Sequence, residues 1–127
     1  MTPIDCDDIQ VVIRKTRRLL RHSRYWCKGT GSVHYVFGLF PRRTYCLRDA
    51  IYVAAGGLLP YLPHCYEPRA FTLLHGYLQL ECEKRGFLSV AKFNDHPLTT
   101  FLQVHSLLWA ASEFFIRQRK ISDAASR

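Results

Sequence analysis

Positively charged side chains crowd one stretch near the start of the chain. Residues 14–28 hold seven of them: Arg14, Lys15, Arg17, Arg18, Arg21, Arg24 and Lys28. The planar fork of arginine grips a phosphate through two hydrogen bonds, so this stretch favours an anionic partner. Rings that could stack on bases, and further arginines, follow closely at Tyr25, Trp26, Arg42, Arg43 and Tyr45.

The net charge of +8 favours nucleic acid, an acidic protein surface or another phosphate-rich assembly as the partner. If residues 14–21 are helical they span about 10 Å, the length of about three phosphates along one strand. The sequence has no zinc-finger spacing, RNP-type motif or helix-turn-helix pattern, so sequence-specific DNA recognition is not predicted. We expect a non-enzymatic binding module. The alternative is a solvated helix face whose arginine stems cover apolar surface.

A thiol enzyme is a further hypothesis. Cys27 lies between Arg24 and Lys28, whose charges could lower the pKa of its thiol. Asp95 and His96 would complete a Cys-His-Asp arrangement if the fold brings them to Cys27. The competing interpretation packs Cys27 in the core and uses residues 94–95 to cap the last helix.

Metal and cofactor sites are not predicted. Four residues could supply zinc ligands, namely Cys27, Cys46, His64 and Cys65, but no close Cys-x₂₋₄-Cys or His-x₃₋₅-His pair is present. The sequence also lacks a Gly-rich phosphate loop, an HExxH motif and a Gly-x-Ser-x-Gly elbow. We therefore expect no metal and no cofactor.

An aromatic cluster suggests another class of function. Exposed rings and arginines are favoured at protein–protein hot spots. A protein-interaction inhibitor would use an aromatic patch formed by Tyr35, Phe37, Phe40 and Tyr61.

The elements that must position these residues are mainly helical. Apolar residues recur at helical spacing and predict helices over residues 5–23, 45–55 and 69–85, and a last helix from about residue 101. In the first of these, Arg14, Arg18 and Arg21 fall opposite the apolar stripe. Residues 33–40 could form a strand of a short hairpin or a packed loop, and residues 87–93 could be helical or extended. We expect one domain of four to five helices over residues 1–121, with a frayed tail at 122–127.

Cysteine usage and hydropathy predict the compartment. The five cysteines form no paired spacing, which is typical of free thiols in a reducing cytoplasm. The first residues lack the basic and apolar regions of a signal peptide, and no apolar run approaches the ~18–20 residues of a membrane span. We expect a cytoplasmic protein without a membrane partner.

Three short motifs resemble a small family of uncharacterised bacterial and phage proteins. The motifs cover residues 26–29 (Trp-Cys-Lys-Gly), 46–50 (Cys-Leu-Arg-Asp-Ala) and 93–95 (Phe-Asn-Asp), and the similarity extends over residues 9–112. The family shows Trp-Cys-x-Gly, Cys-x-x-Gly-Ala and Asn-Asp segments, and Asp49 stands where it usually has Gly. The resemblance implies a shared fold and a role as a phage or mobile-element accessory protein, and no activity.

Overall fold

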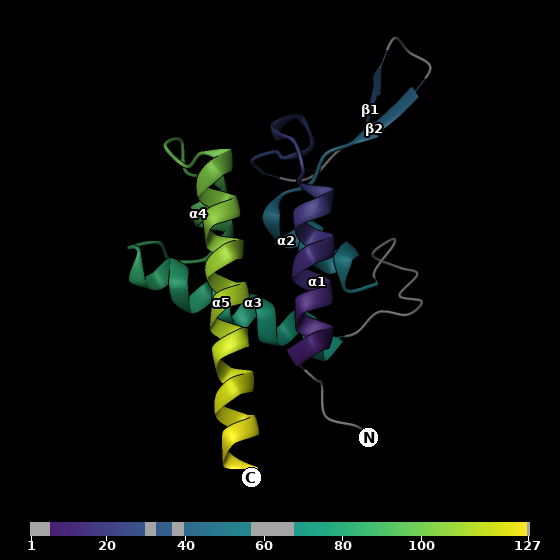
Figure 1. The fold of residues 1–127 in the computed structure, drawn as a ribbon. Coiled ribbons are helices and arrows are strands. Elements are labelled where there is room, and N and C mark those ends of the chain that lie inside the picture. The colour runs from purple at the N-terminus through teal and green to yellow at the C-terminus, as the bar shows by residue number, and fades with distance from the viewer. Residues whose placement is uncertain (1–5, 30–32, 37–39, 57–67, 127) are drawn as a thin grey trace.

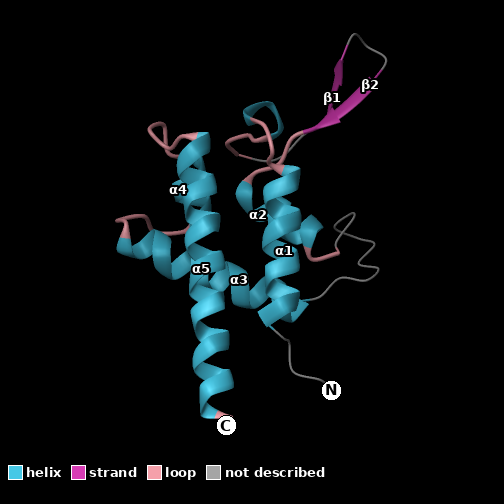
Figure 2. Cartoon of the chain, viewed as in Figure 1, coloured by secondary structure: helices cyan, strands magenta, loops and turns pink. Residues whose placement is uncertain are grey.

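The protein is mainly helical, as the sequence predicts (Figures 1 and 2). The computed structural model describes residues 6–29, 33–36, 40–56 and 68–126. Within these ranges the α-helices are α1 (Cys6–Leu19), α2 (Leu47–Ala54), α3 (Pro68–Lys84), α4 (Val90–Asp95) and α5 (Phe101–Ala125). A 3₁₀ helix, η1 (Ser23–Tyr25), follows α1. Of the two possibilities considered for the segment between the first two α-helices, the hairpin is present: β1 (Val33–Val36) and β2 (Phe40–Arg43) pair antiparallel.

The front layer of the molecule consists of α1 and α5, which run antiparallel, with α3 crossing behind them (Figure 1). Two polar links join the front helices. Gln10 Nε2 donates to the carbonyl of Ser112 at 3.0 Å, and Ser112 Oγ donates back to Gln10 Oε1 at 2.8 Å. Further along, the imidazole of His105 bonds to the carbonyl of Leu20. Both links lie outside the apolar core and hold α5 beside α1.

The inner face of α1 is buried as its spacing predicts. Ile9, Ile13 and Leu20 are 2% exposed or less, and they pack in one core with residues of α2, α3 and α5. Thr16 lies on the same face and is also buried. Its hydroxyl donates to the carbonyl of Val12 at 2.8 Å, which satisfies the polar group inside the core. Burial of this face turns the opposite face of α1 to the solvent.

The first helix ends earlier than residue 23, the predicted end. The amide of Arg21 bonds to the carbonyl of Arg18 in a tighter turn, and the helix closes at Leu19. His22 then caps η1, because its Nδ1 accepts from the amide of Arg24 at 3.2 Å. The expectation of one continuous helix was wrong, since hydropathy alone does not reveal this local cap.

The caps of two other helices come from side chains that the apolar spacing does not identify. Cys46 caps α2, because its Sγ accepts from the amide of Asp49 at 3.4 Å. Asn94 and Asp95 lie within α4 and do not cap the last helix. That role belongs to Thr100, which forms a capping box with Gln103.

The C-terminal helix is long, and its end projects past the other helices (Figure 1). Residues 122–125, expected to fray, are placed within α5 with exposed side chains. None of the helices in the described ranges is long and apolar enough to cross a bilayer.

Candidate functional site

The basic residues that the sequence singles out between positions 14 and 28 are exposed, and Arg14 and Arg18 lie on the outer face of α1. The structure exposes the side chains of Arg14, Lys15, Arg17, Arg18, Arg21, Arg24 and Lys28. The ion pairs found between described residues are elsewhere, for example between Lys84 and Glu81 and between Arg119 and Asp123. None of the seven pairs with a carboxylate among the described side chains. We call Arg14, Arg17, Arg18 and Arg21 the arginine face.

Aromatic rings, not carboxylates, hold several of these cations. The Cζ atom of Arg21 lies 4.4 Å from the ring centroid of Tyr25, and that of Arg24 lies 5.1 Å from the same ring. Arg17 lies over Trp109 of α5, with 5.2 Å between Cζ and the ring centroid. A cation–π contact at an exposed site contributes about 0.5–1 kcal/mol and leaves the positive charge uncompensated. The arginines are therefore oriented and still able to attract an anion.

The pKa of Tyr25 reports on this charge. A hydrogen bond with Arg24 lowers the pKa of the phenol below its usual value, and the positive charges of Arg24 and Arg21 add to the effect. The region around Tyr25 thus stabilises negative charge.

Trp109 of α5 lies beside the arginine face, a position that the sequence does not reveal. It directly follows the buried Leu108 in α5, and 55% of its surface is exposed. In the sequence, the one sign of an exposed position was that this large aromatic residue falls beside the apolar stripe of the last helix and not on it. Its contact with Arg17 depends on the packing of α5 against α1, because the two residues are more than 90 positions apart in the sequence.

Several other residues that the sequence suggested for this site make contacts elsewhere in the protein. Lys28 donates from Nζ to the backbone carbonyl of His96. The indole of Trp26 is half-buried, and its Nε1 donates to Asn94 Oδ1 at 2.7 Å, so this ring holds the fold together. Arg43 lies over the ring of Tyr45, with 5.1 Å between Cζ and the ring centroid. The side chain of Arg42 is outside the described residues, as are those of the proposed aromatic patch, Tyr35, Phe37, Phe40 and Tyr61.

The three motifs of the sequence meet at Asn94, which is only 2% exposed. Besides the bond from Trp26, its Oδ1 accepts from the amide of Leu47 at 3.1 Å, at the start of α2. Its Nδ2 donates to the carbonyl of Cys27 at 3.0 Å and to Asp95 Oδ1 at 2.9 Å. One amide side chain thereby joins the segment after η1, the start of α2 and the end of α4.

Asp95 completes this junction. Its Oδ1 also accepts from the amide of Gly29 at 2.6 Å. Gly29 has φ of 76°, a conformation that side-chain-bearing residues rarely adopt, and this turn directs its amide to the carboxylate. The bond from Gly29 and that from Asn94 lower the pKa of Asp95. Asp95 is thus a structural carboxylate.

The thiol-enzyme hypothesis needs a lowered pKa at Cys27, whereas burial raises the pKa of this thiol. Arg24 and Lys28, the suggested activating charges, are directed to Tyr25 and to the His96 carbonyl. The imidazole of His96 packs edge-on against Phe87, and its Nδ1 accepts from the amide of Leu98. Burial also raises the pKa of Cys46, to about 11. These contacts do not assemble an activated nucleophile.

Metal ligands do not gather in the described part of the chain, where no group of three or more His, Cys, Asp or Glu side chains could hold an ion. His64 and Cys65, two of the ligands considered, lie outside the described residues.

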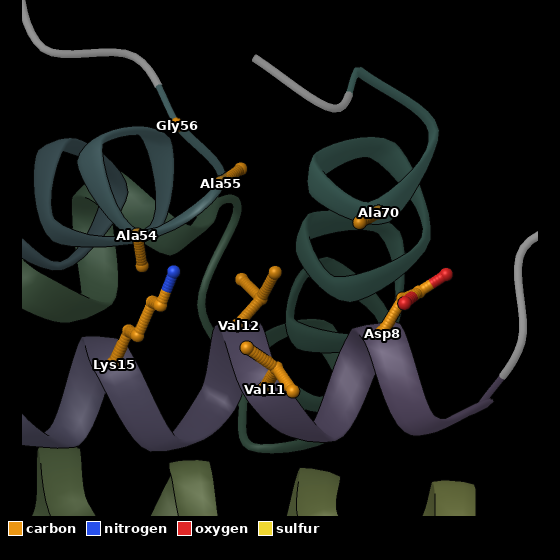
Figure 3. Close-up of a pocket in the computed structure, with 8 residues that line it drawn as sticks. All are labelled: Asp8, Val11, Val12, Lys15, Ala54, Ala55, Gly56 and Ala70. Atoms are coloured by element: carbon orange, nitrogen blue, oxygen red, sulfur yellow. The ribbon is translucent and has the colours of Figure 1, made fainter. Parts of the chain in front are cut away.

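The hollow of Figure 3 lies between α1, the end of α2 and the start of α3. Its volume is about 310 Å³, at the lower limit of ligand pockets. Asp8 and Lys15 stand at opposite ends of its α1 wall, with Val11 and Val12 between them, and small residues of α2 and α3 face them. The charged groups do not converge, so the hollow lacks the arrangement expected of a specific ligand site.

Comparison with known proteins gives a family but no activity. Residues 7–114 match the model of a family described as Family of unknown function (DUF6197). No curated protein and no solved structure matches the chain. The match spans α1 to most of α5 and confirms the resemblance to an uncharacterised domain.

Replacing Asn94 with alanine should strongly destabilise the protein. The change leaves the N–H groups of Trp26 and Leu47 and the carbonyl of Cys27 without their partner, and each such loss costs about 1–3 kcal/mol when buried. We expect urea unfolding to show a loss of about 3 kcal/mol or more. Lys92→Ala, an exposed change in the same helix, should alter the free energy of unfolding by less than about 0.5 kcal/mol. Equal effects of the two substitutions would contradict the role assigned to Asn94.

The thiols of Cys27 and Cys46 should react slowly with iodoacetamide at pH 7. Their raised pKa values leave a smaller thiolate fraction than in free cysteine. Alkylation rates at each site, followed by mass spectrometry of peptides, should fall below that of free cysteine. A faster rate at Cys27 would revive the thiol-enzyme hypothesis.

Proposed function

Because the chain belongs to the Family of unknown function (DUF6197), we propose its function from its own surface: it binds the phosphate backbone of nucleic acid through the arginine face. In this proposal the protein is a small basic module without catalytic activity. The observation that carries it is a set of exposed guanidinium groups that no described carboxylate neutralises.

The spacing of the arginine face suits a phosphate chain. Arg14 and Arg18 lie one turn apart on α1, and Arg21 follows two residues after the helix ends at Leu19. From Arg14 to its end the helix rises about 7.5 Å, the length of about two phosphates of one strand, and Arg21 extends the row beyond it. Arg17 and Arg21 are already oriented by aromatic rings, which reduces the side-chain entropy lost when a phosphate binds. The net charge of +8 would add long-range attraction to a polyanion.

The competing functions have less support. The smaller thiolate fraction that follows from the raised pKa of Cys27 disfavours a thiol enzyme. The protein-interaction patch of Tyr35, Phe37, Phe40 and Tyr61 remains a prediction, because those side chains lie outside the described residues.

Neutralising the arginine face should weaken nucleic-acid binding much more than removing the same charge elsewhere. The test variant is Arg14→Gln/Arg18→Gln/Arg21→Gln. The matched control, Lys84→Gln/Arg85→Gln/Lys92→Gln, removes three exposed positive charges from the region of α3 and α4. Fluorescence anisotropy with labelled 20-nucleotide DNA, single-stranded and duplex, should show at least a tenfold loss of affinity for the test variant, since about three phosphate contacts are lost.

Salt dependence provides the second readout of the same experiment. If about six phosphates are contacted, log K should fall with log salt at a slope near −5 for duplex and about −4 for a single strand. The test variant should lower the magnitude of the slope by about 2–3, because each lost phosphate contact removes about one unit or slightly less. Equal affinity losses for the two triple variants, or a flat salt response of the native protein, would refute the proposal.

A further inference from the structure

We propose that the nucleic acid bound by the arginine face is single-stranded, and that its unpaired bases stack on Trp109 and Tyr25. This inference rests on the proposed function and specifies its ligand. Two aromatic rings that do not pack in the apolar core favour a single strand. Half-buried rings such as Tyr45, Tyr77 and Phe101 pack against the core cluster, whereas Trp109 and Tyr25 are not among the residues packed there.

Trp109 lies on the side of α5 that faces α1. Its neighbours along α5 establish this position, because His105 bonds to Leu20 and Ser112 bonds to Gln10. The indole therefore stands beside the outer face of α1, and Arg17 reaches it. More than half of its surface is exposed, which is unfavourable for so large an apolar ring in the absence of a partner.

Tyr25 is the second such ring, and it lies beyond the end of α1, beside Arg21 and Arg24. Arg21 and Arg24 both lie over its ring, at 4.4 Å and 5.1 Å from Cζ to the centroid. Arg17 and Arg21, which lie over the two rings, are four residues apart, with Arg17 in the last turn of α1 and Arg21 just past its end. Each ring is thus combined with a cation that can bind the adjoining phosphate.

This combination suits a single strand better than a duplex. In a duplex the flat faces of the bases are stacked on one another and only their edges are accessible in the grooves. In a single strand the faces are available, and aromatic side chains beside a basic groove bind them with little sequence preference. Arginines alone would serve either ligand, so the exposed ring of Trp109 and the half-buried ring of Tyr25 decide between the two.

Intrinsic fluorescence can test the role of Trp109 directly. The chain has two tryptophans, and the other, Trp26, is half-buried and bonded to Asn94. A 20-nucleotide oligothymidylate should quench the tryptophan emission of the native protein and bind at least tenfold more tightly than its duplex with oligoadenylate at the same salt concentration. Trp109→Ala should abolish most of the quenching, and Trp109→Phe should retain most of the affinity because it keeps a ring.

The expected loss for Trp109→Ala is about 5- to 150-fold in affinity for oligothymidylate, equivalent to about 1–3 kcal/mol for one stacked base. Affinity for the duplex should fall by less than about threefold, because only the orientation of Arg17 is lost there. Leu80→Ala, which removes an exposed apolar side chain from α3, serves as the control and should leave both affinities unchanged. Circular dichroism of each variant verifies that it is folded.

The failures of this inference and of the proposed function are distinguishable. One outcome contradicts only the single-strand inference: single strand and duplex bind equally, and Trp109→Ala has no effect. In that case the arginine substitutions still weaken binding, and the proposed function stands. If neither nucleic acid binds at low salt, both fall. If a polyglutamate peptide binds more tightly than either nucleic acid and loses affinity in Trp109→Ala, the ligand is an acidic protein and the inference is overturned.

Discussion

Burial of the inner face of α1 is the constraint on which the surface of the protein depends. Ile9, Ile13, Thr16 and Leu20 are almost fully buried, so α1 cannot rotate about its axis without exposing apolar side chains. With that face fixed, the arginines on the opposite side must face the solvent. The links to Ser112 and His105 then set α5 beside α1 and bring Trp109 to Arg17. The burial of the inner face of α1 thereby determines which arginines and aromatic rings lie together on one surface.

The second organising feature is the amide of Asn94. Its four hydrogen bonds join segments near residues 26, 47 and 95, all within one buried junction. A buried amide left without partners is costly, so the native arrangement satisfies each donor and acceptor. This accounts for motifs at Trp26–Cys27 and Asn94–Asp95 without any catalytic role. The residues that looked most like a reactive site in the sequence stabilise the fold, whereas the arginine face makes few internal contacts.

Helical periodicity predicts the fold class, the buried stripe of α1 and the exposure of the arginines opposite it, and the structure agrees. Local caps were harder to predict, because Cys46 at α2 and His22 at η1 act through unusual acceptors, a thiol and an imidazole. The site was predicted only in part. Trp109 could not be assigned to it, because its contact with Arg17 depends on how two distant helices pack. Likewise, Trp26 resembled a stacking ring in the sequence, and its bond to Asn94 became evident only in three dimensions.

The central claim is that phosphates are bound by the outer face of α1. The most direct measurement is a titration of ¹⁵N-labelled protein with oligothymidylate, followed through the side-chain Nε–Hε signals of its arginines. The account predicts that the signals of Arg14, Arg17, Arg18 and Arg21 move together and saturate at the same ligand concentration. Shifts confined to arginines of other elements, such as Arg85 or Arg117, with the α1 signals unchanged, would contradict it.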